Sequence, residues 1–404
     1  MQVILWLFAG SYFLVVAAWW YFAIFYRRQL ERAPLQLEPV DDWPPQLPAP
    51  SLAVVIACHN EEDSIAACVR GVLRQTYPRF CVLIVNDRST DGTGDAVRRL
   101  AKEDARVQLS EIHELPRGWT GKTHALAQAV RGCDAEYLLF IDSDVSLGPQ
   151  AINTVMHKAT IERIDFLSLW PHLDLRSFSE KLLTPPAVVV LGLWALPWQR
   201  TAGDLAGETQ LGNGQFLLVR REAYEKIGGH AGVANELAED AVLASRARAA
   251  GQRCWAGLGT GLYCAFREGG FRRTANSLAR VLVGSLQTQR RLWAGRQVLM
   301  GGGFSAVWIP PAAVLCICLG WHVSVAVLFV VLGVLHWIGM MITLRSALRM
   351  TLVRRGQLVW FPLGSAIVAG IMLWCSYLRS GRGTVRWGAT RYRVQGSRVV
   401  EVGR

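Results

Sequence analysis

The sequence predicts an α/β domain with a mostly parallel sheet, flanked by an N-terminal transmembrane anchor and C-terminal transmembrane helices. Three observations predict this. Between residues 51 and 300, apolar runs of strand length alternate with helical patterns, an order typical of βαβ units. Residues 3–25 form an uncharged stretch long enough to cross a bilayer as a helix. Three more apolar runs follow, at about 304–320, 323–343 and 358–378.

Composition also points to a membrane. Of the 404 residues, 51% are hydrophobic and only 18% are charged, which is more apolar than an ordinary soluble domain. Lysine and arginine number 43 against 31 aspartate and glutamate, a net charge of +12. Much of this excess flanks the apolar runs or lies in the tail, so we assign it to topology and lipid headgroups and expect no nucleic-acid partner. The nine cysteines form no CxxC pair, which favours buried thiols in a reducing compartment.

The N-terminal segment, residues 1–28, is predicted to be a membrane anchor. Its charges, Arg27 and Arg28, follow the apolar core, whereas a cleaved signal peptide carries its charges first and has a shorter core. Basic residues favour the cytoplasmic side, so the anchor should end inside the cell. The Pro-rich residues 29–50 are expected to link it to the domain at 51–300, which would then be cytosolic.

The C-terminal part divides into a predicted membrane domain, residues 301–380, and a basic tail, residues 381–404. Only Trp321 and His322 separate the first two apolar runs, which indicates a helical hairpin. Three full crossings would carry the Arg-rich tail out of the cytosol, against the positive-inside tendency. We therefore expect one run to be re-entrant or interfacial, and a cytosolic tail, in a multi-pass protein of the inner (cytoplasmic) membrane.

A shorter apolar stretch, Leu182–Trp198, allows two interpretations. It is too short, and too interrupted by proline, for a clear span. It could be a helix at the membrane interface beside the site, or a buried part of the α/β core. The sequence leaves both interpretations open.

Polar residues gather at one edge of the predicted sheet. The expected strands are Leu52–Ala57, Phe80–Val85, Val107–Ile112 and Tyr137–Ile141, with helices beginning near Glu61, Asp91 and Gly121. Ligands of open α/β sheets bind in the crevice at the carboxyl ends of the strands. The polar residues after the first, second and fourth runs are therefore the candidates for a site.

The strongest cluster is Asp142-Ser143-Asp144, directly after the fourth run. Side chains two positions apart on an extended chain point the same way, so the two carboxylates can converge. Carboxylate oxygens suit Mg²⁺ or Mn²⁺, which keep coordination positions for the phosphate oxygens of a substrate. Asp142 and Asp144 are therefore the predicted metal ligands.

Three other acidic positions follow strand-like runs or begin helices. Asp91 is expected to cap the helix that follows it. Asp87 lies at the strand end itself, where its carboxylate could accept a hydrogen bond from a nucleobase. The pair Glu239-Asp240 could merely complement a helix N-terminus, or it could supply a general base that deprotonates an acceptor hydroxyl.

Taken in chain order, these motifs resemble the inverting glycosyltransferases of family 2, which have the GT-A fold. The motifs are NExxS at 60–64, NDxSxDGT at 86–93, DSD at 142–144 and ED at 239–240, and the resemblance covers roughly residues 50–290. LPxGWxGK at 115–122 resembles the hopanoid-biosynthesis-associated branch, and ceramide glucosyltransferases are a more distant comparison. The resemblance implies a Rossmann-like GT-A domain and a hexosyltransferase-type reaction.

The resemblance also implies how a nucleotide-sugar donor is bound. The backbone from Ala57 to His59, together with Glu61, would hold the nucleoside. Asp87 would bind the base, which is uracil in this pattern, so the donor would be UDP-linked. Lys122 could contact the diphosphate, or it could be a solvated lysine at a helix start.

Catalytic roles follow from the same pattern. Asp142 would lie near the ribose or the diphosphate, and Asp144 would bind the metal. Asp240 would be the general base, with Glu239 supporting it. Because attack comes from the face opposite the leaving group, no covalent sugar–enzyme intermediate is expected.

The sequence departs from the family pattern in two places. Asn86 stands where the pattern usually has aspartate. The QxxRW motif of many relatives, which helps to hold acceptor and diphosphate, is not intact, and the nearest match is Gln287, Arg290, Arg291 and Trp293. These four residues are assigned a site role on the resemblance only. Residues 386–392 resemble a WxGxxY tail of membrane-bound relatives, which could pack under the catalytic domain or anchor at the interface.

The expected function is therefore metal-dependent transfer of a single sugar to a membrane-lipid acceptor at the cytosolic face, with a hopanoid as the acceptor that the resemblance favours. Two alternatives stay open. One is a processive polysaccharide synthase, which the broken QxxRW motif disfavours. The other is a catalytically silent membrane scaffold, which the intact carboxylate set disfavours. The sugar, the acceptor and the oligomeric state are not determined by the sequence.

Overall fold

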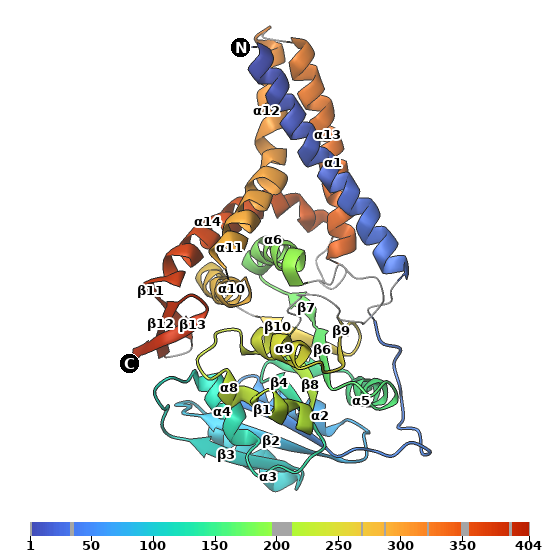
Figure 1. The fold of residues 1–404 in the computed structure, drawn as a ribbon, viewed down its shortest axis with the longest axis vertical. Helices are drawn as coiled ribbons and strands as arrows, with labels where there is room; N and C mark the ends of the chain where they lie inside the picture. Colours follow the sequence, from blue (N-terminus) through green and yellow to red (C-terminus); the bar gives the residue numbers. More distant parts are fainter. Residues whose placement is uncertain are drawn as a thin grey trace.

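The computed structural model describes residues 2–32, 36–195, 212–267, 270–286, 288–320, 323–348, 355–387 and 390–403. An α/β domain lies at one end of the molecule and a bundle of apolar helices at the other (Figure 1). Helices α6, α10 and α14 lie between these two parts.

A seven-stranded sheet forms the centre of the α/β domain, in the order β3-β2-β1-β4-β8-β6-β9. Its strands are β1 (Leu52–Cys58), β2 (Phe80–Asp87), β3 (Val107–Ile112), β4 (Tyr137–Asp142), β6 (Phe166–Trp170), β8 (Phe216–Arg220) and β9 (Cys254–Leu258). β1 pairs in parallel with β2 and β4, whereas β8 runs antiparallel to β4 and β6. The mostly parallel sheet is therefore confirmed, and the four predicted strands begin at the predicted residues.

A second, three-stranded sheet packs nearby in the order β5-β10-β7. Its strands are β5 (Val145–Leu147), β7 (His172–Leu175) and β10 (Tyr263–Arg267). The helices of the domain are α2 (Ile65–Leu73), α3 (Thr93–Glu103), α4 (Gly121–Ala129), α5 (Ala151–Ile161), α7 (Arg221–Lys226), α8 (Gly229–Gly232) and α9 (Glu239–Ala249).

Alternation along β1 shows why the sheet needs helices on both faces. Its side chains are at most 2% exposed, apart from a half-buried Ala57. Val54 and Ile56 pack in one core with residues of α2, α3 and α5, whereas Ala53 and Val55 pack in another with residues of α4 and α9. A strand buried on both faces reads as a continuous apolar run, as this one does.

Register brings the predicted site together. In the parallel pairs, Ala57 of β1 lies opposite Asp142 of β4 and Val85 of β2, and Cys58 lies opposite Asn86. The residues that follow these three strand ends therefore leave the sheet at the same edge.

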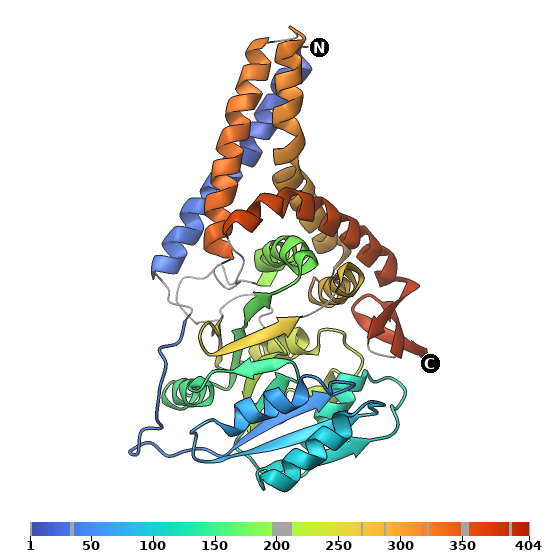
Figure 2. The same cartoon turned by 180° about the vertical axis from the view of Figure 1, so that it is seen from behind.

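Within the described residues, four segments are long and apolar enough to cross a membrane: Val3–Phe25, Gln289–Cys318, Val323–Ser346 and Gly356–Arg379. They belong to α1 (Gln2–Arg32), to α11 (Gln289–Gln297) with η1 (Val298–Phe304) and α12 (Ser305–Cys318), to α13 (Val323–Ala347), and to η2 (Arg355–Trp360) with α14 (Phe361–Arg379). The expected N-terminal and C-terminal apolar helices are thus present. α1, α12 and α13 run side by side away from the domain, whereas α14 runs obliquely across the base of this bundle (Figures 1 and 2).

Polar contacts tie the bundle together where water is excluded. Tyr12 Oη lies 3.0 Å from His336 Nδ1, and His336 Nε2 lies 2.7 Å from the Gly302 carbonyl. Trp19 Nε1 donates to the same carbonyl at 2.6 Å. Many other side chains of α1 face outward, and Val3 and Leu7 are about 70% exposed, as a lipid-facing helix requires.

Helix α6 (Phe178–Ala195) contains most of the short apolar stretch that allowed two interpretations. Leu183, Ala187 and Val190 are fully buried against α14 and α10 (Phe271–Ser285). The helix thus belongs to the layer between the bundle and the domain rather than to the core of the central sheet. The end of the predicted stretch, 196–198, lies outside the described residues.

The basic tail is an ordered antiparallel sheet rather than an unstructured extension. Its strands are β11 (Ser380–Trp387), β12 (Thr390–Gln395) and β13 (Arg398–Gly403). Val385, Tyr392 and Val394 are buried in one core with residues of α10 and α14.

Candidate functional site

A cavity of about 1820 Å³ opens at the carboxyl ends of β1, β2 and β4. Seven of the residues that the sequence predicts for the site line this cavity: Ala57, His59, Glu61, Asp87, Lys122, Asp142 and Asp144. On the opposite side it is closed by α10, by Trp374 of α14 and by Tyr392 of β12. Three of the four sequence clusters therefore share one cavity, as the positions of the strand ends predicted.

The loop after β1 is shaped by hydrogen bonds to the loop after β2. Asn60 has a positive φ of 55°, and its side-chain oxygen accepts from Thr90 N at 2.8 Å. Glu61 N donates to Thr93 Oγ1 at 2.8 Å, while its carboxylate accepts from Ser64 Oγ at 2.6 Å. His59 Nδ1 lies 2.5 Å from the backbone carbonyl of Asp87, the last residue of β2. The two loops thus form one rigid wall of the cavity.

The sequence predicts that Asp91 caps the following helix, whereas Gly92 occupies the N-cap position of α3 and Asp91 lies one residue before it. Asp91 Oδ1 accepts from Thr93 N at 3.0 Å and from Thr93 Oγ1 at 2.5 Å, at the first residue of α3. Hydrogen bonds to a carboxylate favour its ionised form, and they hold the pKa of Asp91 below its usual value despite the opposing effect of burial.

Asp87 is 4% exposed, and Arg88 engages both of its carboxylate oxygens. Arg88 Nε donates to Oδ1 at 2.7 Å and Nη2 donates to Oδ2 at 2.9 Å. Arg88 adopts a positive φ of 56°, which turns its side chain back onto its neighbour. A base at this corner would meet an aspartate whose orientation is fixed by a fork of two hydrogen bonds.

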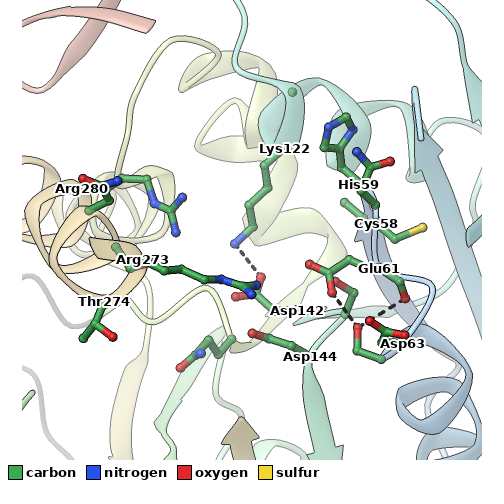
Figure 3. A pocket seen from close by; sticks show the side chains of 18 of the residues that line it. Cys58, His59, Glu61, Asp63, Lys122, Asp142, Asp144, Arg273, Thr274 and Arg280 are labelled. Carbon is green, nitrogen blue, oxygen red and sulfur yellow. Dashed lines mark hydrogen bonds and ion pairs between the residues drawn. The ribbon is translucent and has the colours of Figure 1, made fainter. Parts of the chain in front are cut away.

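Lys122 is held in two ion pairs and is only 19% exposed, so it is not a solvated lysine at a helix start. Its Nζ lies 2.7 Å from Asp142 Oδ1 and 3.0 Å from Glu239 Oε1. Burial alone would lower its pKa, but Asp142, Glu239 and Asp240 outweigh burial and raise it. The lysine is therefore charged. It pairs with Asp142 at a strand end (Figure 3), and it also pairs with Glu239 at the start of α9.

Asp240 lies behind the cavity wall, next to Gly214. Gly214 N donates to Asp240 Oδ2 at 2.6 Å, and Ala241 N donates to Oδ1 at 2.7 Å. Burial and the Glu239 carboxylate raise the pKa of Asp240 to about 7, while Lys122 opposes the shift. The pKa of Asp240 is therefore shifted toward neutral pH, which is the direction that suits a general base.

Asp142 and Asp144 both line the cavity, separated by the buried Ser143. Asp142 is at the last residue of β4, and Asp144 directly precedes β5, so the turn between the strands presents both carboxylates. Among the described residues, no three or more His, Cys, Asp or Glu side chains form a cluster that could hold a metal by themselves. Asp142 and Asp144 are the two carboxylates that this turn contributes to the lining of the cavity.

The QxxRW-like residues are placed elsewhere. Arg290, Arg291 and Trp293 lie on α11, at the base of the apolar bundle, and Trp293 is 63% exposed. None of these three lines the cavity. Gln287 lies outside the described residues.

Several lining residues were not found by reading motifs. Arg273, Thr274 and Arg280 project from α10 into the space in front of Asp142 and Asp144 (Figure 3). Their signal in the sequence is the amphipathic pattern of 271–285, with Leu278, Leu282 and Val283 buried on the other face. Tyr392 carried only the weak signal of the WxGxxY tail, and it now proves to reach the catalytic domain.

Comparisons with known proteins identify the domain. Residues 53–228 match the family model described as glycosyl transferase family 2. The chain is 27% identical over 201 residues to 4,4'-diaponeurosporenoate glycosyltransferase of Staphylococcus aureus (strain bovine RF122 / ET3-1), covering 48% of this chain and 50% of that protein. The same enzyme of strain USA300 is 26% identical over the same length. The chain thus spans about half the length of the curated relatives it matches.

A solved structure confirms the fold. It is the mannosyltransferase PcManGT from Pyrobaculum calidifontis in complex with GDP-Man and Mn²⁺. The TM-score is 0.51 at 18% sequence identity, over 82% of this chain and 97% of that one. This likeness confirms the predicted GT-A fold, and the family 2 match covers residues 53–228 of the chain.

Proposed function

We propose that this chain, which carries a glycosyl transferase family 2 domain over residues 53–228, transfers a single sugar from a nucleotide-sugar to a lipid-type acceptor. The position of Lys122 is the observation that carries the proposal. Its ammonium group joins Asp142, at the strand end where the donor would bind, to Glu239, the neighbour of the proposed base. Clusters about 100 residues apart in sequence are thus assembled around one cation.

The donor would lie along the strand ends. The backbone from Ala57 to His59, with Glu61, would border the nucleoside, and Asp87 would accept a hydrogen bond from the base. These residues all line the cavity. The family resemblance favours uracil, whereas the solved mannosyltransferase binds GDP-Man. Donor assays should therefore include both UDP-linked and GDP-linked sugars.

A divalent cation, Mg²⁺ or Mn²⁺, would be held by Asp142 and Asp144. The donor set fits such an ion, because Mg²⁺ is usually held by one or two carboxylates and completes its shell with substrate phosphates and water. When bound, the ion would neutralise charge on the leaving diphosphate. The ammonium group of Lys122 would be a second cationic group, beside the metal ion, near the oxygens of the diphosphate.

Proton transfer is assigned to Asp240. The acceptor hydroxyl oxygen forms a bond to the anomeric carbon while the bond from that carbon to the diphosphate breaks, and the hydroxyl proton passes to the Asp240 carboxylate. A pKa of about 7 leaves a useful fraction ionised at neutral pH and makes the carboxylate a better base than an ordinary aspartate. Glu239 supports the base by raising that pKa and by holding Lys122.

The acceptor is proposed to enter from the membrane. α10 presents Arg273, Thr274 and Arg280 to the cavity and its apolar face to α14, and Trp374 of α14 also lines the cavity. A lipid with a polar head could therefore present its hydroxyl to the site while its apolar body stays beside these helices. The Staphylococcus relatives are named as glycosyltransferases of 4,4'-diaponeurosporenoate. A hopanoid would meet the same requirement.

Membrane orientation follows from which elements touch. Tyr392 and Arg398 of the tail sheet contact the α/β domain directly, so both lie on the same side of any bilayer. Between them the chain must then cross an even number of times. We propose that α12 and α13 cross, that α14 lies at the interface, and that α1 is the third crossing. The basic residues after α1 favour the cytosolic side of the inner membrane for the domain.

The proposal is tested by supplying purified full-length protein with a panel of nucleotide-sugars, Mg²⁺ or Mn²⁺, and extracted lipids including hopanoids. We expect one new glycolipid, one sugar heavier than its acceptor, by mass spectrometry. A ladder of products would instead support a processive synthase. Absence of transfer and of donor hydrolysis with every donor would support a silent scaffold.

Asp240→Asn tests the base assignment. Because an amide cannot take the proton, we expect kcat to fall about 10²–10⁴-fold while donor affinity stays within twofold. Asp95→Asn, on the exposed face of α3, is the matched control and should retain full activity. Normal turnover by Asp240→Asn would remove this residue from the mechanism.

A further inference from the structure

The C-terminal sheet is attached to the loop that leads into the proposed base. Arg398 Nε lies 2.7 Å from Glu236 Oε1, and Ser397 Oγ donates to the other oxygen of that carboxylate at 3.0 Å. Two backbone hydrogen bonds between 235–237 and 397–399 accompany this pair, at 3.2 and 2.8 Å. The sheet therefore has a fixed position on the domain.

A second attachment lies in the cavity. Tyr392, on β12, is only 3% exposed and lines the cavity. Its hydroxyl oxygen accepts a hydrogen bond from Gly121 N at 3.3 Å. Gly121 is the first residue of α4, and the next residue is Lys122. One tyrosine of the tail thus contacts the helix start that carries the central cation.

Tyr392 also lies beside Arg88, because both side chains line the cavity and both approach Gly121. Gly121 N donates to the Tyr392 hydroxyl, and Arg88 Nη2 lies 2.9 Å from where a Cβ of residue 121 would be. The hydrogen bonds of Arg88 with Asp87 are the main reason that its pKa is raised, and a hydrogen bond with Tyr392 raises it further. Arg88 in turn holds both oxygens of Asp87. The tyrosine hydroxyl, the guanidinium and the carboxylate therefore form a chain that ends at the residue assigned to the nucleobase.

Packing keeps the tyrosine ring in place. Val385, Val394 and Val399 of the same sheet share a core with residues of α10 and α14. Leu237, in the loop that precedes the proposed general base Asp240, belongs to the same core. The side chains of Val385, Val394 and Val399 are at most 4% exposed. The ring position is thus set by apolar packing, and the hydroxyl alone makes the polar contacts.

We propose that Tyr392 is a positioning residue of the donor site, contributed by the C-terminal sheet. Through its hydroxyl it holds Arg88 and the start of α4, and through Arg88 it orients Asp87 toward the nucleobase. The tail sheet is then a functional part of the glycosyltransferase site and not only a membrane anchor. This inference rests on the proposed function, because it assumes that Asp87 binds the base.

Tyr392→Phe is the direct test, because it keeps the ring and removes only the hydroxyl. Binding of UDP and GDP to the purified full-length protein is measured by calorimetric titration, without turnover. For the nucleoside diphosphate that binds the wild type, we expect the dissociation constant to rise about fivefold, the loss of one to two hydrogen bonds. Inorganic pyrophosphate has no base and can report only the contact with the start of α4, so its dissociation constant should rise less than that of the nucleoside diphosphate.

Tyr377→Phe is the matched control. The Tyr377 hydroxyl also donates a hydrogen bond, to the Arg382 carbonyl at 3.0 Å, but the side chain is 51% exposed and does not line the cavity. Its removal should leave nucleotide affinity unchanged. Equal loss of UDP and pyrophosphate affinity in Tyr392→Phe would indicate a general structural effect and would overturn the positioning role.

A double variant tests the route through Asp87. If Tyr392 acts on the base through Arg88 and Asp87, Tyr392→Phe should have no further effect in an Asp87→Asn background. Full additivity of the two losses would contradict that route. A wild type that binds neither UDP nor GDP would overturn the proposed function and this inference with it. A wild type that binds one of them, with Tyr392→Phe binding it equally tightly, would overturn this inference alone.

Discussion

Asp240 shows how the charge of one residue depends on residues far away in sequence. Its pKa is raised to about 7 by burial and by Glu239, and Lys122 limits the rise. Lys122 comes from the start of α4, more than 100 residues earlier. The acid–base property of the proposed base is therefore a product of the fold, and each neighbour pushes it in a known direction.

The pH dependence of the reaction should report this arrangement. Only the ionised carboxylate can accept the proton, so kcat/KM should fall as the pH falls through about 7. Removing the Glu239 charge in Glu239→Gln should move this acidic limb to lower pH. Removing the Lys122 charge in Lys122→Met should move it to higher pH. The measurement is the midpoint of the limb, not the maximal rate, because Lys122 is also proposed to contact the diphosphate.

Opposite shifts in the two variants are the critical result. The exposed variant Asp95→Asn should leave the midpoint where it is in the wild type. Midpoints that stay fixed in both Glu239→Gln and Lys122→Met would show that another group titrates.

Site residues were predictable where their position depends on local sequence alone. Asp87, Asp142 and Asp144 follow strand-length apolar runs, and parallel strands bring such ends to one edge. The partners of these residues were not predictable. The Arg88 fork depends on a positive φ, and the two ion pairs of Lys122 depend on how α4 and α9 pack, which no short motif encodes.

Helix α4 depends on having a glycine at its first position. A Cβ at residue 121 would collide with the Asp87 carboxylate and lie 2.9 Å from Arg88 Nη2. Gly121→Ala should therefore push this pair out of position and raise the donor KM about tenfold, a loss of about 1.4 kcal/mol in binding. Steady-state kinetics with varied donor would measure it, with the acceptor KM expected to stay constant.

Gly71→Ala is the control at the level of the element. Gly71 lies inside α2, where an added Cβ would make only ordinary contact with Leu147 backbone atoms at 3.6 Å or more. Alanine favours a helix over glycine by about 1 kcal/mol, so this variant should be as active as the wild type and no less stable. An unchanged donor KM in Gly121→Ala would show that the α4 start does not position the pair.

Elements were predictable to different degrees. Unbroken apolar runs in the sequence predict the first four strands of the central sheet and the apolar helices. The tail sheet is not predicted in this way, because β11 and β12 are rich in arginine. Among its described side chains, Val385, Tyr392, Val394 and Val399 reach the core. With so few buried positions, the sequence pattern of these strands predicts a charged tail, because the surface that buries them belongs to α10 and α14.

At the scale of the whole molecule, two observations support the proposed set of membrane crossings. The tail sheet touches the α/β domain, so both lie on one side, and α12 and α13 form a hairpin that leaves and returns. α14 is long and apolar enough to cross, yet it is the most buried of the four candidates and packs against α6 and α10. An interfacial α14 would also remove the conflict with the positive-inside tendency, because the arginine-rich tail would then stay on the proposed cytosolic side.

This topology predicts thiol labelling from opposite sides of the membrane. In a cysteine-free background that retains activity, single cysteines are introduced as Leu319→Cys in the α12–α13 turn, Gln395→Cys in the tail sheet and Lys102→Cys in the α/β domain. Leu319 and Gln395 are both exposed, and Lys102 lies on the exposed face of α3. A membrane-impermeant maleimide should label Leu319→Cys in right-side-out vesicles and the other two only in inverted vesicles. Because α14 separates the hairpin from the tail, labelling of Gln395→Cys on the side of Leu319→Cys would require α14 to cross. That topology would break the contact of Tyr392 with the α/β domain, and the donor-site inference depends on this contact.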